Sequence, residues 1–137
     1  WRGDEDIQRL TVKTKGRNHF VDITTMIAEE VESSGIERGI CTLFVPHTTC
    51  GITINENTDP DVLFDMLHIL DGLVPWKGSY RHAEGNSAAH LKASLMGFSV
   101  QVLINNGRLC LGTWQGIYLC EFDGPRNREI WIQLFAG

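Results

Sequence analysis

The sequence lacks any hydrophobic run long enough to cross a membrane, since no stretch approaches the roughly 18 apolar residues of a spanning helix. It also lacks basic clusters, because its 12 Lys and Arg residues are scattered and are outnumbered by 17 Asp and Glu residues. The net charge is −5. Nucleic-acid-binding domains normally carry a basic stripe, and membrane-surface proteins carry a polybasic patch. The sequence therefore predicts neither a nucleic-acid partner nor a membrane partner.

Cysteine is scarce, and no two cysteines have the C-x-x-C spacing of a zinc knuckle or a thioredoxin-type motif. The four cysteines are Cys41, Cys50, Cys110 and Cys120. In a domain of this size we interpret them as reduced thiols, which predicts a cytoplasmic protein. Internal repeats and low-complexity tracts are absent as well, so residues 1–137 are expected to form a single domain.

Hydrophobic patterns predict an α+β fold. Alternating or continuous apolar runs predict strands at 7–13, 19–23, 39–45, 50–55, 99–104, 108–111, 116–122 and 128–135. Helices are predicted at 26–34, from 60 to about 71, and from 87 to about 96, with Gly35, Asp59 and Asn86 as their expected caps. Asn106-Gly107 indicates a hairpin. We therefore expect a mostly antiparallel sheet of seven to eight strands, folded as a sandwich, with about three helices.

The stretch 80–90 concentrates polar chemistry at a predicted helix start. It holds His82, Glu84 and His90 around Asn86, which is a good N-cap. The free N–H groups of a helix start favour anions, so these side chains are candidates for holding a metal, a phosphate or both. The alternative is a capped surface helix with two unrelated histidines.

The segment His47-Thr48-Thr49 follows Pro46, where a buried strand is interrupted. Such a break exposes side chains, and the hydroxyl groups of Thr48 and Thr49 are candidate ligands for phosphate oxygens. The alternative is a tight bend whose threonines bond free backbone groups. Arg108, beside the expected hairpin, is a further candidate phosphate ligand. Trp114 is interpreted as a core residue of a kinked hairpin.

Carboxylates gather at residues 55–61, before and at the second helix start. Asp59 is interpreted as the cap of that helix. Among the carboxylates here, Glu56 is the one that a role in helix capping explains least. Oxygen ligands suit magnesium, and a carboxylate can also serve as a general base. His47, His82 and His90 are candidates for a three-nitrogen metal site with Glu56 or Glu84 nearby. His68, within the second helix, is interpreted as a packing or solvent-facing residue.

Three segments together resemble one family. The first joins His47-Thr48-Thr49 to residues 51–57 and 59–61; the second is 80–86 with His90; the third contains Gly112-Thr113-Trp114-Gln115-Gly116 and residues 106–108 and 121–126. They are similar to the YjbQ-like family, also called UPF0047 or the secondary thiamine-phosphate synthase family. The resemblance covers nearly the whole chain. Cys50 stands where a small residue such as Ala is expected.

The resemblance implies seven or so strands in two sheets, and a homotrimer packed through those sheets. It implies a weak thiamine-phosphate synthase activity on phosphorylated small molecules. From the histidines and carboxylates we expect a divalent metal, magnesium or zinc, as the cofactor. The matching polar positions are His47, Asn55, Glu56, Asp59, His82, Glu84, Asn86, His90 and Gln115. We expect His47, Glu56, His82 and His90 to be catalytic, and Thr48, Thr49, Asn55, Glu84, Asn86, Arg108 and Gln115 to bind substrate. His47, His82, His90, Glu56 and Asp59 are the candidate metal ligands. The alternative function is a metal- or anion-binding homotrimer without turnover.

Overall fold

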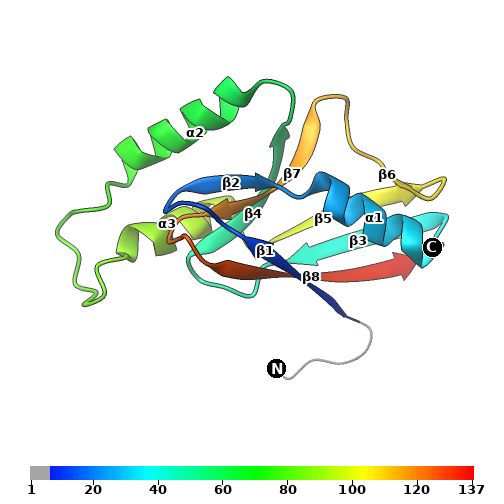
Figure 1. Cartoon of the computed structure of the whole chain (residues 1–137), viewed down its shortest axis with the longest axis horizontal. Coiled ribbons are helices and arrows are strands. Elements are labelled where there is room, and N and C mark those ends of the chain that lie inside the picture. Colours follow the sequence, from blue (N-terminus) through cyan, green and yellow to red (C-terminus); the bar gives the residue numbers. More distant parts are fainter. Residues whose placement is uncertain (1–6) are drawn as a thin grey trace.

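The computed structural model describes residues 7–137 and confirms the predicted two-sheet α+β architecture (Figure 1). The described strands are β1 (Gln8–Lys13), β2 (His19–Asp22), β3 (Arg38–Phe44), β4 (Cys50–Glu56), β5 (Ser99–Asn105), β6 (Arg108–Leu109), β7 (Gln115–Glu121) and β8 (Asn127–Ala136). The helices are α1 (Thr24–Ser34), α2 (Pro60–Leu73) and α3 (Ser87–Met96). A five-stranded sheet has the order β1-β8-β3-β5-β6, and a three-stranded sheet has the order β2-β7-β4. All pairings are antiparallel.

The main hydrophobic core lies between the two sheets. Successive side chains of a strand point to opposite faces, so only alternate residues reach this core. β3 contributes Cys41 and Leu43, and β4 contributes Ile52 from the facing sheet. Helix α1 closes the core with Ile27 and Val31, both of which are buried. The sandwich therefore buries one face of each sheet.

A second hydrophobic cluster lies where α3 packs on the other face of the three-stranded sheet. Ala89 and Ala93 of α3 belong to this cluster together with the aromatic side chains of Phe20, Tyr118 and Phe122. Leucine and methionine side chains of α2 pack against the same cluster. The close approach of α3 depends on Gly51 of β4, because a Cβ atom there would lie 2.6 Å from the carbonyl oxygen of Gly97.

Local end signals gave the correct position for one end of each helix, but the third lacks the expected side-chain cap. Gly35 ends α1 in the left-handed conformation, with φ 72°. Asp59 caps α2, since its side chain accepts from the backbone N–H of Asp61 at 3.0 Å. Asn86, however, makes no capping hydrogen bond with its side chain. The reason is a tertiary contact, because Asn86 Nδ2 donates to Asp123 Oδ2 at 2.8 Å.

The expected hairpin joins β5 to β6, and Asn106 and Gly107 have φ angles of 52° and 72°. The prediction that Trp114 belongs to the core was wrong, because its side chain is 61% exposed. Trp114 precedes β7 in a turn that is held by three hydrogen bonds, one of them from Gln115 N–H to the Gly112 carbonyl at 3.1 Å. The Trp114 carbonyl accepts from Asn57 N–H at 2.9 Å, and Gln115 Oε1 accepts from Gly112 N–H at 2.8 Å.

The outer face of the five-stranded sheet carries large apolar side chains that residues 7–137 leave exposed. Ile40 and Phe44 of β3 lie on this face together with Leu103 of β5 and Phe135 of β8, and all four are exposed. Among residues 7–137, no helix is both long enough and apolar enough to span a membrane. The four cysteines are free thiols.

Candidate functional site

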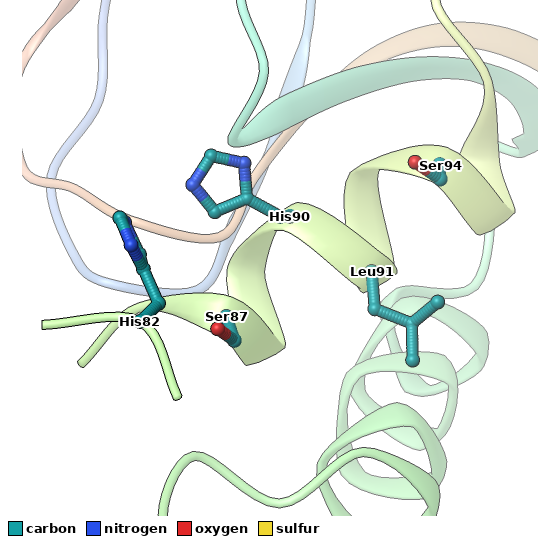
Figure 2. Close-up of a pocket in the computed structure, with 5 residues that line it drawn as sticks. All are labelled: His82, Ser87, His90, Leu91 and Ser94. Carbon is teal, nitrogen blue, oxygen red and sulfur yellow. The ribbon is translucent and has the colours of Figure 1, made fainter. Parts of the chain in front are cut away.

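His82 and His90 lie side by side at the start of α3 (Figure 2). Their ring centroids are 5.6 Å apart and the rings meet edge to face, at 79°. His90 belongs to the first turns of the helix, and His82 comes from the loop that leads into it. That loop turns back at Gly85, which has φ 75° and donates its N–H to the carbonyl of His82 at 3.1 Å. The turn therefore brings His82 across from His90.

The two imidazoles line an open depression of about 530 Å³. Ser87, Leu91 and Ser94, which follow one stripe of α3, complete its lining. Leu91 is half exposed and gives the depression an apolar side. A ligand here would meet imidazole and hydroxyl groups at the helix start and a hydrocarbon surface one turn further along.

Two of the first backbone N–H groups of α3 have no partner among residues 7–137; Ser87 lines the depression, whereas Ala88 is buried. Ala89 and His90 donate their N–H groups to the carbonyl of Asn86, at 3.0 and 3.4 Å. Ser87 and Ala88 have no backbone or side-chain partner for theirs among residues 7–137. Unpaired N–H groups and the positive end of the helix dipole together favour an anion.

A buried ion pair lies behind this helix start. Arg128 Nε donates to Glu121 Oε1 at 2.8 Å, and both side chains are almost fully buried. Thr14 Oγ1 also donates to Glu121 Oε1, at 2.7 Å. Burial opposes ionisation of Glu121, but the hydrogen bonds from Arg128 and Thr14 outweigh it and hold the pKa below its ordinary value. The pair is therefore ionised at neutral pH.

The structure gives His47 and Thr49 structural partners. Thr49 is buried, and its hydroxyl oxygen accepts from the Arg128 guanidinium at 2.8 Å. His47 Nε2 accepts from the backbone N–H of Glu129 at 2.9 Å. Burial and the nearby Arg128 charge lower the pKa of His47, so it is neutral at pH 7 with its proton on Nδ1. A metal at Nε2 would have to displace the Glu129 bond. Thr48 is exposed beside them.

Other predicted site residues gather at the end of the three-stranded sheet where β4 finishes. Glu56 pairs in register with Gln115, and Glu56 Oε2 accepts from Thr58 N–H at 3.0 Å. Asn55 Oδ1 accepts from Glu56 N–H at 2.8 Å. Glu84 is exposed in the loop before α3, while Arg108 is exposed on β6 of the other sheet.

The part of the chain that the structure describes contains no group of three His, Cys, Asp or Glu side chains placed to hold a metal. His47, His82 and His90 therefore do not form a three-nitrogen site within one chain. The His82–His90 pair offers two imidazole ligands, which suit zinc better than magnesium. Magnesium prefers oxygen ligands, and the carboxylates of Glu56 and Asp59 already accept backbone hydrogen bonds.

The sequence patterns used above did not predict a role for Asp123 or for the buried ion pair of Glu121 and Arg128. Glu121 and Arg128 occupy inward positions of their strands, in phase with buried Leu119 and Ile130. A charge in the inward phase of an apolar strand predicts a buried partner of opposite charge, and two such charges on hairpin-linked strands predict an ion pair. That signal was present in the sequence.

A family model described as UPF0047 protein YjbQ-like matches residues 8–137. The UPF0047 protein YugU of Bacillus subtilis is 50% identical over 131 residues, which are 95% of this chain and 99% of the relative. The UPF0047 protein MJ1081 of Methanocaldococcus jannaschii is 48% identical over 128 residues, which are 93% of each chain.

Solved structures agree with these relatives. A conserved protein of the YjbQ/UPF0047 family from Clostridium acetobutylicum superposes with a TM-score of 0.92 at 52% identity, covering 93% of this chain and 99% of that one. A YjbQ-like protein of unknown function from Sulfolobus solfataricus P2 gives a TM-score of 0.91 at 34% identity, covering 96% of both chains.

Proposed function

Because this chain belongs to the UPF0047 YjbQ-like family, we propose that it is a weak thiamine-phosphate synthase-type enzyme acting on phosphorylated small molecules. The activity is the one that the family resemblance implies. The observation that supports it is the pair of facing imidazoles, His82 and His90, beside the unpaired N–H groups of α3. Such a site suits a phosphate group, since it supplies several hydrogen-bond donors and the positive end of a helix dipole.

The reaction would join a hydroxymethylpyrimidine diphosphate to a thiazole phosphate. A bond forms between the methylene carbon of the pyrimidine and the ring nitrogen of the thiazole. The bond from that carbon to the diphosphate oxygen breaks, and its electron pair leaves with pyrophosphate. The main requirement is therefore a stabilised leaving group. In this proposal, the N–H group of Ser87 binds a pyrophosphate oxygen, and His82 and His90 donate to the other oxygens.

A divalent metal has a defined place in this proposal. The described residues of one chain do not form a three-group cluster. Magnesium would therefore arrive with the diphosphate as its counter-ion, and it would offset the repulsion between an anionic substrate and a protein of net charge −5. Glu56 and Asp59 would add oxygen ligands only if another copy of the chain brought them to the depression.

We propose a cytoplasmic homotrimer as the working form. The exposed side chains of Ile40, Phe44, Leu103 and Phe135 give the outer face of the five-stranded sheet an apolar surface that a second copy would cover. Packing of these faces around a threefold axis would bury all three copies of that surface. The same trimeric packing is compatible with the second candidate function, a homotrimer that binds an anion or a metal without turnover.

Calorimetric titration with pyrophosphate, with and without magnesium, tests the site, and an assay for the joined product tests the activity. Saturable binding that His82→Ala weakens, together with magnesium-dependent turnover, supports the enzyme. Tight stoichiometric zinc without turnover supports the binding protein instead. Absence of both pyrophosphate and zinc binding would overturn both functions.

A further inference from the structure

A cleft of about 340 Å³ lies where the turn between β7 and β8 meets the end of β1. Its lining residues are Lys13, Thr14, Pro125, Arg126 and Asn127, and none of them is acidic. Two cations without a lining carboxylate are notable in a protein of net charge −5. A concave surface that carries charge of one sign concentrates ions of the opposite sign. The cleft therefore favours an anion.

The backbone of Arg126 is fixed against the end of β1. Its N–H donates to Thr14 Oγ1 at 3.0 Å, and its carbonyl accepts from Thr14 N–H at 2.9 Å. Thr14 is buried, and the N–H of Gly124 donates to the Arg17 carbonyl at 3.3 Å. The turn between β7 and β8 thus lies against the turn that joins β1 to β2 (Figure 1). These bonds give Arg126 a defined place at the cleft.

The guanidinium of Arg126 is held along one edge by Asp123. Nε donates to the Asp123 carbonyl at 2.9 Å, and Nη2 lies 3.2 Å from Asp123 Oδ2. The same Oδ2 accepts from Asn86 Nδ2 at 2.8 Å, so the carboxylate is itself fixed. A guanidinium has five donors in a rigid fork, and Nη1 has no partner among residues 7–137. Because the side chain is 49% exposed, the remaining edge is open to a ligand.

Lys13 and Asn127 add two further donors to the cleft. They are register partners on β1 and β8, and both are exposed. Neither side chain forms an ion pair or a hydrogen bond with another of residues 7–137. The charges of Lys13 and Arg126 together balance the two negative charges of a phosphate monoester. The amide of Asn127 supplies a neutral donor to the same oxygens.

We propose that this cleft binds a phosphate monoester, with Arg126 as the fixed donor and Lys13 and Asn127 as adaptable ones. The inference deepens the proposed function and rests on it for the identity of the ligand. The proposed reaction has two phosphorylated substrates, and the depression at α3 provides for the diphosphate. The cleft would hold the thiazole phosphate. Asp123 contacts both Arg126 and Asn86, so one carboxylate links the cleft to the start of α3.

Titration of the full chain with inorganic phosphate, followed by NMR chemical shifts, tests the site. Arg126→Gln should weaken binding at the cleft about tenfold, because it removes the fixed, charged fork. Lys13→Gln leaves the contacts of Asp123 intact and should weaken binding about threefold, since Lys13 is exposed. The control is Arg38→Gln, which removes an exposed charge beside the end of β8 and should change the affinity by less than about twofold.

The shifts themselves show where phosphate binds. Saturable shifts at Thr14, Arg126 and Asn127 support the cleft, whereas shifts confined to Ser87 and His90 would overturn the inference. An Arg126→Gln affinity equal to that of the original chain would overturn it as well. If Arg126→Gln lowers the thermal midpoint, Lys13→Gln decides, and an unchanged affinity in that variant would reject the site.

Turnover separates this inference from the proposed function. Where the joined product forms, Arg126→Gln should raise KM for the thiazole phosphate about tenfold and keep KM for the pyrimidine diphosphate within about twofold. An unchanged KM for the thiazole phosphate would overturn the inference alone. Phosphate binding at the cleft without any joined product would instead overturn the proposed function and leave the anion site established.

Discussion

Arg128 on β8 and Glu121 on β7 form a buried ion pair that ties the two sheets together. The same Arg128 guanidinium donates to Thr49, and the same Glu121 carboxylate accepts from Thr14 and from two backbone N–H groups. Because both carboxylate oxygens of Glu121 and the Nε and Nη2 atoms of Arg128 have partners, the low dielectric of the interior strengthens the network. Removing either member would leave an unpaired charge in the core.

Arg128→Met is therefore expected to destabilise the fold by about 3–5 kcal/mol, because the Glu121 carboxylate would lose its buried counter-charge. Denaturant unfolding measures this change. Arg38→Met, at an exposed position of β3, is the matched control and should change the free energy of unfolding by about 0.5 kcal/mol or less. A loss at Arg128 no larger than that at Arg38 would contradict the structural role of the pair.

The free energy of unfolding should fall as the pH drops below about 6.5, where the unfolded chain begins to protonate His47. In the folded chain, burial and the Arg128 charge lower the pKa of His47, so folding opposes its protonation. His47→Gln retains an acceptor for the Glu129 N–H and should flatten the dependence between about pH 6.5 and 5.

Denaturant unfolding at a series of pH values gives the slope of the free energy of unfolding against pH for the original chain and for His47→Gln. His19, whose pKa burial also lowers, contributes equally to both proteins. Glu121 has a pKa below its ordinary value, so its own contribution is lost only as the pH falls below about 4.3. Identical slopes above pH 5 for the original chain and His47→Gln would show that His47 does not contribute.

His82→Ala should weaken pyrophosphate binding or turnover by roughly a hundredfold, the scale of one positioned acid–base or electrostatic group, with the fold intact. The matched control is His68→Ala. His68 stacks on the exposed Phe64 along α2, with centroids 6.3 Å apart, and should affect only stability. Affinity, turnover and thermal midpoints are compared for both variants. Equal, small effects would place the functional centre elsewhere.

Leu103→Glu should convert the proposed trimer to monomers, because Leu103 is 64% exposed on the apolar outer face and a charge there cannot be buried against another copy. Light scattering at micromolar concentrations gives the mass. Phe64→Glu, at a 68% exposed position on α2, is the control and should leave the mass unchanged. A monomer mass for the original chain would reject the trimer.

The sequence by itself determined the elements whose signals are local. The Asp59-Pro60 start, the Gly35 end and the Asn106-Gly107 turn each depend on backbone preferences within a few residues, and all three are present in the structure. Strand periodicity likewise predicted a two-sheet sandwich, since a half-buried strand must alternate. His82 and His90 were predicted to lie near one helix start, and the structure places them together.

Only the tertiary structure decided how the helix start is used. Asn86 has the chemistry of a cap, but Asp123, 37 residues away, competes for its side chain and prevents the cap. In the same way, the backbone N–H of Glu129 donates to Nε2 of His47, and the turn before β7 leaves Trp114 exposed. The physical reason is that a polar side chain bonds the partner that folding brings nearest. That partner depends on strand register and sheet packing, which the neighbouring residues do not specify.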